Sequence, residues 1–421
     1  MTMPHLINDE ERQARHHFAQ GDFAKAEVFF RRLAQAAPRD PLAQYNLGVT
    51  LGKLDRLEEA MSFYRLTIEL NPVFADAYIN FGTCLNELNL TTQARKGFAL
   101  ARQITPDNPI PILNEGLAAL AMGDYAAGWK DFAARWQLPV YEKFKRNFSQ
   151  PTWNGEDLAG KTLFLFAEQG FGDTLQMARY IPLLTAKGAK VILESPPALT
   201  RLLRHVQGSP HVITKGEDIP DFDFYCSMMD IPRAFGTVLE TVPAAVPYLY
   251  ADDTEIAFYR DLSPHKAARR IGLSWAGRTS HENDRNRSLS FSQTAPLLAQ
   301  ENIEWISLQR VVTDRDAQDI ASSRIVDWGK DFSDFASAAA AVMALDLVIT
   351  VDTAIAHLAG ALGKPVWILL PFYADWRWLK EREDSPWYPT ARLFRQKERK
   401  NWTEVIERVS EEATAYSNAA P

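Results

Sequence analysis

The chain has 421 residues, a formal net charge of −7 and a pI near 5.7. This length accommodates two or three domains with separate cores, and the acidic balance argues against general nucleic-acid binding, which usually leaves a basic footprint. The two cysteines, Cys84 and Cys226, lie far apart and match neither a disulfide framework nor a zinc-binding spacing. We therefore expect both to be reduced, structural residues.

Hydropathy predicts a protein without membrane-spanning segments. The start, "MTMPHLINDEERQARHHF", lacks the apolar core of a signal peptide. No apolar run approaches the roughly 18 residues that suggest a membrane span. We expect a cytoplasmic enzyme or adaptor with no membrane span and no nucleic-acid partner.

Residues 7–138 contain a repeat with a period of 34 residues. Small, aromatic and proline residues recur at that interval: Ala26, Ala60 and Ala94; Phe30, Tyr64 and Phe98; Pro38, Pro72 and Pro106; Gly48, Gly82 and Gly116. Small residues let paired helices approach, aromatic residues fill the space between them, and proline ends the second helix. The pattern resembles the tetratricopeptide repeat and predicts about four helix pairs. The fourth is degenerate, because Glu115 and Gly128 replace an apolar residue and an alanine.

We interpret the recurring residues as packing residues of an all-α solenoid over residues 1–138. Such a unit cannot bury its apolar face alone, so several units must stack. The concave face of a stacked array usually holds peptides. We therefore expect any function of this part to lie on that face.

A connecting segment is predicted at residues 139–160, with the domain boundary near 150. The helical pattern fades at Pro139, and an aromatic, basic stretch ending in "PTWNGEDLAGK" follows. Beyond it, strands alternate with helices, which predicts parallel sheets covered on both faces. We expect an α/β region of two Rossmann-like lobes, residues 161–262 and 263–421.

The predicted strands of these lobes are short apolar runs. They read "KTLFLFAE", "KVILES" and "HVIT" in the first lobe, then "RIGLSWAG", "IEWISLQ", "LDLVITVD" and "PVWILLP" in the second. The segment "GDTLQMARYIPLLTAKG" predicts a helix kinked at Pro182, and the stretch before residue 260 predicts loops. The final helix, "WTEVIERVSEEATAY", is expected to pack on one lobe.

Ligands of open parallel sheets bind at the carboxyl ends of strands, and three polar clusters follow predicted strands. The first is "AEQGFGDTLQ". Gly170 and Gly172 loosen a strand-to-helix turn so that a ligand can approach the backbone. Asp173 begins the helix, where it either caps the helix, a common role of aspartate, or acts on a ligand.

The second cluster, "SWAGRTSHENDRNRSL", follows the first predicted strand of the second lobe. Its polar residues are Arg278, His281, Asn283, Arg285 and Arg287. Guanidinium groups bind phosphate in a fork, so the loop favours an anionic ligand. The alternative is an ordinary solvated loop.

The third cluster opens "VDTAIAHLAGALGKPVWILLP". Asp352 ends a predicted strand, and Thr353 and His357 lie four residues apart, hence on one face of the next helix. The free N–H groups of a helix start favour a diphosphate. His357 is either a packed histidine or a ligand contact, and its coincidence with Asp352, Thr353 and a helix start favours contact.

Two of these motifs resemble those of one enzyme family. "DTAIAHLAGALGKP" resembles the donor-site motif of bacterial heptosyltransferase-like (family 9-type) glycosyltransferases, which have the two-lobed GT-B fold. "GFGDTLQMARYIPLL" resembles the motif of their first lobe, and "DWRWLKEREDSPWYPTARLFRQ" strengthens the likeness. The whole chain looks like bacterial proteins that fuse tetratricopeptide repeats to such a lobe pair.

The resemblance implies roles for individual residues. Asp173 matches the general base, which deprotonates the acceptor for attack on the anomeric carbon with inversion. Asp352, Thr353 and His357 match the donor-binding motif, and Ala354 stands where the family commonly has glycine. The implied donor site also includes Gly172 and Arg278. Further possible phosphate or sugar contacts are Gln169, Arg285, Arg287, Gln309 and Trp376.

The resemblance thus implies an inverting glycosyltransferase that uses a nucleotide sugar. We expect no cofactor and no metal, because basic groups and helix N–H groups would neutralise the leaving diphosphate. The repeats favour a protein or peptide acceptor bound on their concave face. Three alternatives stay open: a non-catalytic adaptor with a vestigial transferase domain, a glycan- or lipid-directed transferase, and a sugar-nucleotide epimerase.

Overall fold

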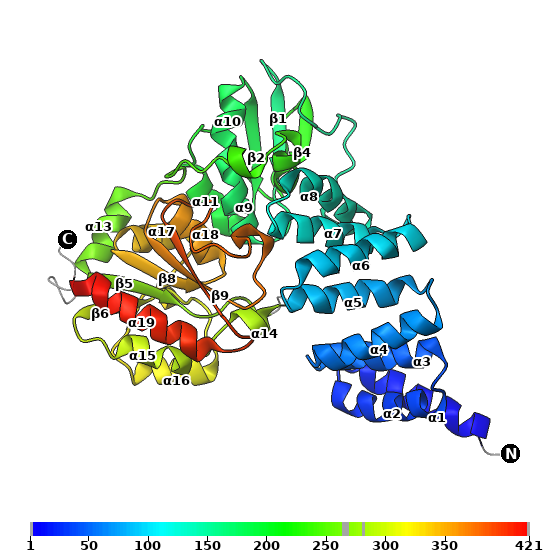
Figure 1. The fold of residues 1–421 in the computed structure, drawn as a ribbon. Helices are drawn as coiled ribbons and strands as arrows, with labels where there is room; N and C mark the ends of the chain where they lie inside the picture. The colour runs from blue at the N-terminus through cyan, green and yellow to red at the C-terminus, as the bar shows by residue number, and fades with distance from the viewer. Residues whose placement is uncertain (1–2, 263–268, 280–282, 419–421) are drawn as a thin grey trace. The chain divides into compact units, whose positions relative to one another are not determined.

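The chain divides into two compact units, Met1–Lys145 and Arg146–Pro421 (Figure 1). The computed structural model of the protein describes residues 3–262, 269–279 and 283–418. His281, and residue 263 at which the second lobe is predicted to begin, lie outside the described residues. The predicted connecting segment is divided between the two units after residue 145.

The first unit consists of helix pairs followed by short 3₁₀ helices. The elements are α1 (Met3–Ala19) with α2 (Phe23–Ala36), α3 (Pro41–Lys53) with α4 (Leu57–Leu70), α5 (Ala75–Glu87) with α6 (Thr91–Ile104), α7 (Pro109–Ala121) with α8 (Tyr125–Phe132), then η1 (Ala133–Gln137) and η2 (Pro139–Phe144). Asp40 and Asn108 cap α3 and α7, and both helices begin with a proline, whose missing N–H is not needed there. The predicted helix pairs are present.

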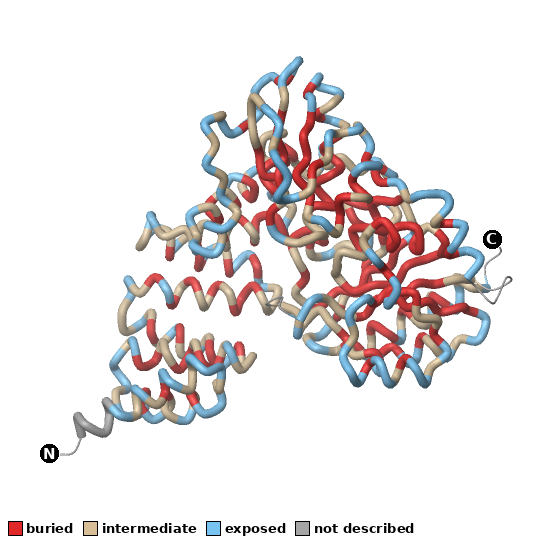
Figure 2. Tube along the Cα trace, turned by 180° about the vertical axis from the view of Figure 1, so that it is seen from behind, coloured by how far each residue is buried: buried red, intermediate tan, exposed pale blue. Residues whose placement is uncertain are grey.

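Close contacts within each pair explain the 34-residue period. A Cβ atom added at Gly48 would lie 2.8 Å from the Tyr64 ring, and one added at Gly82 would lie 2.7 Å from the Phe98 ring. Figure 2 shows buried and exposed positions alternating along these helices. In the degenerate fourth pair, a Cβ at Gly128 would lie 2.5 Å from Leu120. Glycine at this position therefore permits an even closer approach.

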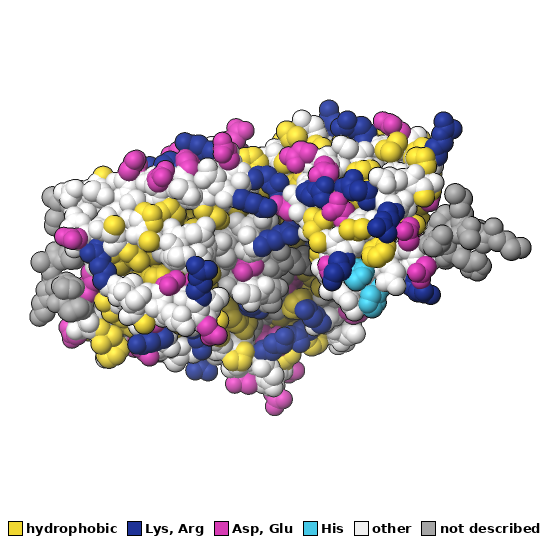
Figure 3. Space-filling view, turned by 90° about the horizontal axis from the view of Figure 1, so that it is seen from below, with side chains coloured by type: hydrophobic (Ala, Val, Ile, Leu, Met, Phe, Trp, Pro, Cys, Tyr) yellow, Lys and Arg dark blue, Asp and Glu magenta, His cyan; other side chains and the backbone are white. Residues whose placement is uncertain are grey.

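Ion pairs connect neighbouring repeats on the surface. Glu27 of α2 pairs with Arg31 of the same helix at 2.6 Å and with Arg56, just before α4, at 2.7 Å. Arg95 of α6 pairs with Asp124, the cap of α8, at 3.2 Å. Figure 3 shows basic and acidic side chains interspersed over the face that it presents. Ion pairs near the surface contribute little stability individually.

The second unit contains two parallel sheets. The first has the order β3-β2-β1-β4, formed by β1 (Thr162–Phe166), β2 (Lys190–Ser195), β3 (His211–Thr214) and β4 (Phe224–Ser227). The prediction of loops before residue 260 is wrong for β4, because the acidic residues around it in "DFDFYCSMMD" concealed its pattern. Thr152 forms a bridge to Tyr225 of β4, so the chain joins this sheet soon after residue 146.

The second sheet has the order β10-β9-β8-β5-β6-β7. Its strands are β5 (Arg269–Ser274), β6 (Ile303–Ser307), β7 (Val326–Asp327), β8 (Leu347–Val351), β9 (Val366–Leu370) and β10 (Ala391–Arg395). Every residue of β6, β8 and β9 is buried, as expected of parallel strands covered on both faces. The two edge strands were not predicted from the sequence, because β7 has two residues and β10 is only partly buried.

The helices of the second unit are mostly short. They are α9 (Phe171–Met177), α10 (Ile181–Ala186), α11 (Pro197–Leu203), α12 (Ile231–Ala234), α13 (Asp253–Asp261), α14 (Asp284–Arg287), α15 (Ala295–Leu298), α16 (Asp314–Ala321), α17 (Phe335–Met343), α18 (Ala354–Ala361) and α19 (Trp402–Asn418). The helix predicted to kink at Pro182 is instead interrupted by η3 (Ala178–Tyr180), and Pro182 lies in the first turn of α10, where proline is tolerated. α19, the predicted final helix, packs against the second sheet through Val405 and Val409.

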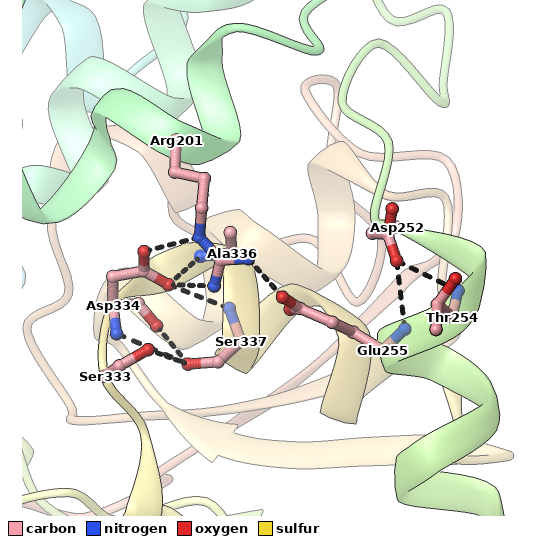
Figure 4. Close-up of polar contacts among 8 residues, drawn as sticks. All are labelled: Arg201, Asp252, Thr254, Glu255, Ser333, Asp334, Ala336 and Ser337. Carbon is pink, nitrogen blue, oxygen red and sulfur yellow. Dashed lines mark hydrogen bonds and ion pairs between the residues drawn. The ribbon is translucent and has the colours of Figure 1, made fainter.

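Helices that follow strands of the two sheets contact one another. α9, which follows β1 of the first sheet, packs against α18, which follows β8 of the second. Arg201 of α11 donates to Asp334, the cap of α17, at 2.7 and 2.8 Å and also contacts Glu255 of α13 (Figure 4). These contacts hold the helices of the two sheets together within one compact unit.

Candidate active site

The turn after β1 positions Asp173. β1 ends at Phe166, and Gln169 has a left-handed backbone with φ +62° before α9 begins. Such a conformation costs energy for a residue with a side chain, and it is enriched at functional sites. The Asp173 carboxylate accepts a hydrogen bond from the Gly170 N–H at 2.7 Å. Asp173 therefore caps α9 from within its first turn, and its oxygens retain further acceptor capacity.

Arg377 holds the other oxygen of the Asp173 carboxylate. It lies in η8 (Trp376–Trp378), and its Nη2 donates to Asp173 Oδ1. Its Nε donates to Gln176 at 2.6 Å, and its Nη1 donates to Asp375 at 2.8 Å. Arg377 is only 7% exposed, so its charge needs these partners. One arginine of the segment between β9 and β10 thus fixes two side chains of α9.

The surroundings of Asp173 make it a stronger base than an ordinary aspartate. Burial raises the pKa of the Asp173 carboxyl, Arg377 and the Gly170 N–H oppose this rise, and Asp375 and Glu168 reinforce it. Burial that disfavours the charged form increases the affinity of a carboxylate for a proton. Strongly perturbed carboxyl groups are concentrated at functional sites.

The turn after β8 forms the start of α18. Thr353 caps the helix by accepting a hydrogen bond from the Ile355 N–H at 3.3 Å. Asp352 precedes the cap, and its backbone carbonyl accepts a hydrogen bond from Arg287 at 2.9 Å. Ala354 is the first helical residue. The first N–H groups of a helix have no partner within the helix, which suits them to an anionic group.

His357 lies one turn into α18 and is buried. Its Nδ1 lies 2.9 Å from the Tyr388 hydroxyl, and its ring stacks on Trp378 with centroids 5.4 Å apart. A Cβ atom at Gly172 of α9 would lie 2.7 Å from His357 Cδ2. The absence of a side chain at Gly172 therefore lets the first and third clusters meet.

Burial perturbs the two titratable groups of this third cluster. Burial and repulsion from Asp375 raise the pKa of Asp352 to about 6, and Arg287 opposes the rise. Burial and nearby guanidinium groups, that of Arg377 foremost, hold the pKa of His357 well below its usual value. Near neutral pH, His357 is an uncharged hydrogen-bonding group.

The basic loop after β5 reaches both strand-end turns. Arg287 contacts the carbonyl of Asp352, and the Arg278 guanidinium lies 5.7 Å from the centre of the Phe171 ring at the start of α9. Arg278 and Arg285 are exposed. The second cluster therefore joins the first through Arg278 and the third through Arg287.

Three other residues suggested by the sequence have different surroundings. Gln309 accepts a hydrogen bond from the Ala276 N–H at 3.2 Å and donates to the Ala276 carbonyl at 3.0 Å, so its amide fixes the loop after β5. Trp376 is buried, and the Arg377 guanidinium lies 4.3 Å from the centre of the Trp376 ring. Gln169 is exposed at the left-handed turn.

Some residues that complete the site were not predicted from the sequence: Gln176, Arg179, Asp375, Arg377 and Tyr388. Arg179 is buried, donates to the Tyr248 hydroxyl at 3.1 Å and lies 4.5 Å from the centre of the Tyr388 ring. A signal for Arg377 was present in "DWRW", because an arginine between two tryptophans needs a buried acceptor. That signal does not identify the acceptor.

The carboxylates of the site surround an arginine. Burial opposes ionisation of Arg377, but Asp375, Asp173 and Asp352 raise its pKa above the ordinary value.

Among the described residues, no group of three or more His, Cys, Asp or Glu side chains is arranged to hold a metal ion. No helix in the described part of the chain is long and apolar enough to cross a membrane.

Comparisons with known proteins support the repeats. A family profile for the tetratricopeptide repeat matches residues 42–74. Protein FlbA of Caulobacter vibrioides is 23% identical over an alignment 449 positions long, which covers 91% of this chain and 74% of that protein. The crystal structure of MamA is 19% identical and covers 34% of this chain and 84% of its own, with a TM-score of 0.31. The NMR structure of the second TPR domain of human RPAP3 with an HSP70 peptide is 21% identical and covers 27% of this chain and 97% of its own, with a TM-score of 0.26. The chain has a helical solenoid like that of tetratricopeptide repeats, with the profile match at residues 42–74, followed by an α/β region with parallel sheets.

Proposed function

We propose that the protein is an inverting, metal-independent glycosyltransferase of the GT-B type. One observation carries this proposal. Asp173 at the end of the first sheet and the start of α18 at the end of the second sheet are brought together through Arg377 and the Gly172–His357 contact. A base on one lobe then faces an anion-binding helix start on the other.

The groups of this site suit an inverting displacement. Asp173 would take the proton of an acceptor hydroxyl as its oxygen attacks the anomeric carbon, while the bond from that carbon to the diphosphate oxygen breaks. The raised pKa of Asp173 favours this proton transfer. The N–H groups at the start of α18, with Arg287 and Arg278, would stabilise the charge on the departing diphosphate.

The repeats favour a protein or peptide as the acceptor. Tetratricopeptide arrays form extended concave binding surfaces, and the RPAP3 domains among the similar structures are described with bound HSP90 and HSP70 peptides. A nucleotide sugar would bind the α/β unit, and the repeats would bind the polypeptide that is modified.

The non-catalytic adaptor is favoured by a different observation. Both Asp173 oxygens already have partners within the protein, Gly170 and Arg377. A vestigial site held together by its own ion pairs would show the same contacts. Ligand binding and transfer separate the two proposals.

Thermal denaturation with a panel of nucleotides and nucleotide sugars tests the donor site. A ligand that binds the folded state raises Tm, and we expect one nucleotide to do so. Asp352→Ala and His357→Ala should abolish the shift, whereas Asp384→Ala, an exposed control residue paired with Arg382, should retain it. Folded protein that shows no shift with any nucleotide would favour the adaptor.

Mass spectrometry of cellular proteins tests the transfer. Cells that overproduce the wild-type chain should contain a host protein carrying the sugar, and cells that overproduce Asp173→Asn should not. Sugar found only on glycans or lipids would assign the alternative acceptor class. Absence of any sugar product, with a working donor site, would argue against transfer.

A further inference from the structure

We infer that Arg377 is a positioning residue that couples the Asp173 carboxylate to the donor-binding half of the site. The catalytic consequence of this coupling rests on the proposed function. The structural claim, that the Arg377 guanidinium fixes the Asp173 carboxylate, does not depend on the proposed function.

Arg377 holds one turn of α9 through two hydrogen bonds. Asp173 and Gln176 are three residues apart and therefore lie on one face of the helix, and Arg377 donates to both side chains. Gln176 is fully buried. The Arg377 guanidinium also lies 4.3 Å from the centre of the Trp376 ring, which restricts its position. The carboxylate of Asp173 can therefore not turn independently of Arg377.

The same guanidinium acts on the donor half. Burial has the largest effect on both groups: it raises the pKa of Asp352 and lowers the pKa of His357. The charge of Arg377 lowers the pKa of both groups. A diphosphate at the start of α18 would add negative charge near Arg377. Attraction to that charge would weaken its hold on Asp173 and strengthen the base when a donor is present.

The charged groups that shift the pKa of Asp173 come from different elements. Arg377 and Asp375 come from the segment around η8, Glu168 follows β1, and neutral His357 of α18 lies against Gly172. Arg377 is the cation in this set, so its removal must make the carboxylate harder to ionise. Removal of Asp375 must have the opposite effect.

Titration of Asp173 in the unliganded full-length protein tests the coupling directly. Carbon-13 NMR of labelled aspartate carboxyl groups, with the signal assigned by its loss in Asp173→Asn, follows this one group through pH. We expect Arg377→Gln to raise the pKa of Asp173, Asp375→Asn to lower it, and Arg377→Lys to change it least. Arg201→Gln is the matched control, because Arg201 also links the two lobes but contacts Asp334 and Glu255 instead.

Kinetics separate positioning from general support of the fold. Arg377→Lys keeps a positive charge but loses the fork, so we expect kcat to fall about 10- to 100-fold with the donor Kd nearly unchanged. The acidic limb of the kcat/KM profile should move to higher pH in Arg377→Gln. In Arg201→Gln both quantities should match the wild type.

The outcomes distinguish this inference from the proposed function. An unchanged Asp173 titration in Arg377→Gln, or a loss of donor affinity with kcat unchanged in Arg377→Lys, would overturn the inference while leaving transfer intact. The expected titrations without any transfer would overturn the function and leave the coupling. If Arg377→Gln does not fold, Arg377→Lys and Asp375→Asn decide the result, since Asp375 is partly exposed and asparagine can also cap η8.

Discussion

The repeats and the α/β unit assemble their key contacts over very different distances along the chain. In the repeats, the glycine and the ring that meet belong to one helix pair, as Gly82 of α5 and Phe98 of α6 do. In the α/β unit, Asp173 and Arg377 are 204 residues apart. Contacts between neighbours can form piecewise, whereas distant contacts require the whole unit. Local damage should therefore remain local in the first unit and reach the site in the second.

The largest expected effect is the loss of the proposed base. Asp173→Asn should lower kcat by about 10²- to 10⁴-fold, the usual contribution of a general base, and leave donor binding nearly unchanged. A transfer assay with labelled nucleotide sugar and parallel thermal denaturation would measure both. Asp384→Asn provides the control on an exposed carboxylate, and a fully active Asp173→Asn enzyme would exclude Asp173 as the base.

A second prediction concerns the stability of the α/β unit as a function of pH. The native pKa of Asp352, about 6, lies above the usual 3.8, so the native state binds more protons and loses stability as pH rises between these values. Asp352→Asn should remove this loss and stabilise the protein above pH 6 by at most about 3 kcal/mol. Chemical denaturation from pH 4 to 8 should show the gain appearing only as pH rises. A constant difference across that range would contradict the prediction.

A third prediction damages the repeats alone. Gly82→Ala places a Cβ 2.7 Å from the buried Phe98 ring and should destabilise the first unit by about 1–3 kcal/mol. Gly52→Ala is the matched control, because its Cβ would meet only the Tyr64 hydroxyl, at 3.5 Å. Circular dichroism during heating should show an early helical transition in Gly82→Ala, while nucleotide binding persists. Loss of that binding would show that the local damage spreads.

The smallest expected effect comes from Tyr388→Phe. It removes the partner of His357 Nδ1 and should cost about 1 kcal/mol, the usual net value of a hydrogen bond. Tyr250→Phe, which alters an exposed tyrosine bonded to the Pro247 carbonyl, should cost less. Urea denaturation of the two variants would compare them. Equal stabilities would mean that the Tyr388 hydroxyl is not needed to hold His357.

The repeats were the easiest part of the fold to predict, because the residues that recur every 34 positions contact the adjacent helix. The central strands were also predictable, since β8 and β9 are buried on both faces and read as continuous apolar runs. The edge strands β7 and β10 and the acidic surroundings of β4 lack that pattern. They depend on pairing with strands already formed.

The candidate site was predicted in pieces. Asp173 and His357 follow strands at which parallel sheets bind ligands, and the structure brings their turns together through Gly172. Arg377 was not predicted, although "DWRW" indicated a buried charge, because its acceptors Asp173 and Gln176 lie far away along the chain. Gln309 was suggested as a contact, but its amide is used within the loop after β5. These differences arise where a side chain finds its partner in a segment far away along the chain.

The indole rings around Arg377 also provide an intrinsic optical label. Of the eleven tryptophans in the chain, only Trp129 and Trp136 precede residue 146, and the first 128 residues contain none. Fluorescence therefore reports mainly on the α/β unit, with Trp376, Trp378 and Trp387 gathered at the candidate site. The quantum yield of these rings should change when a nucleotide binds, while the first repeats contribute no tryptophan fluorescence. Ligand binding and repeat unfolding can thus be followed separately in a single unmodified chain.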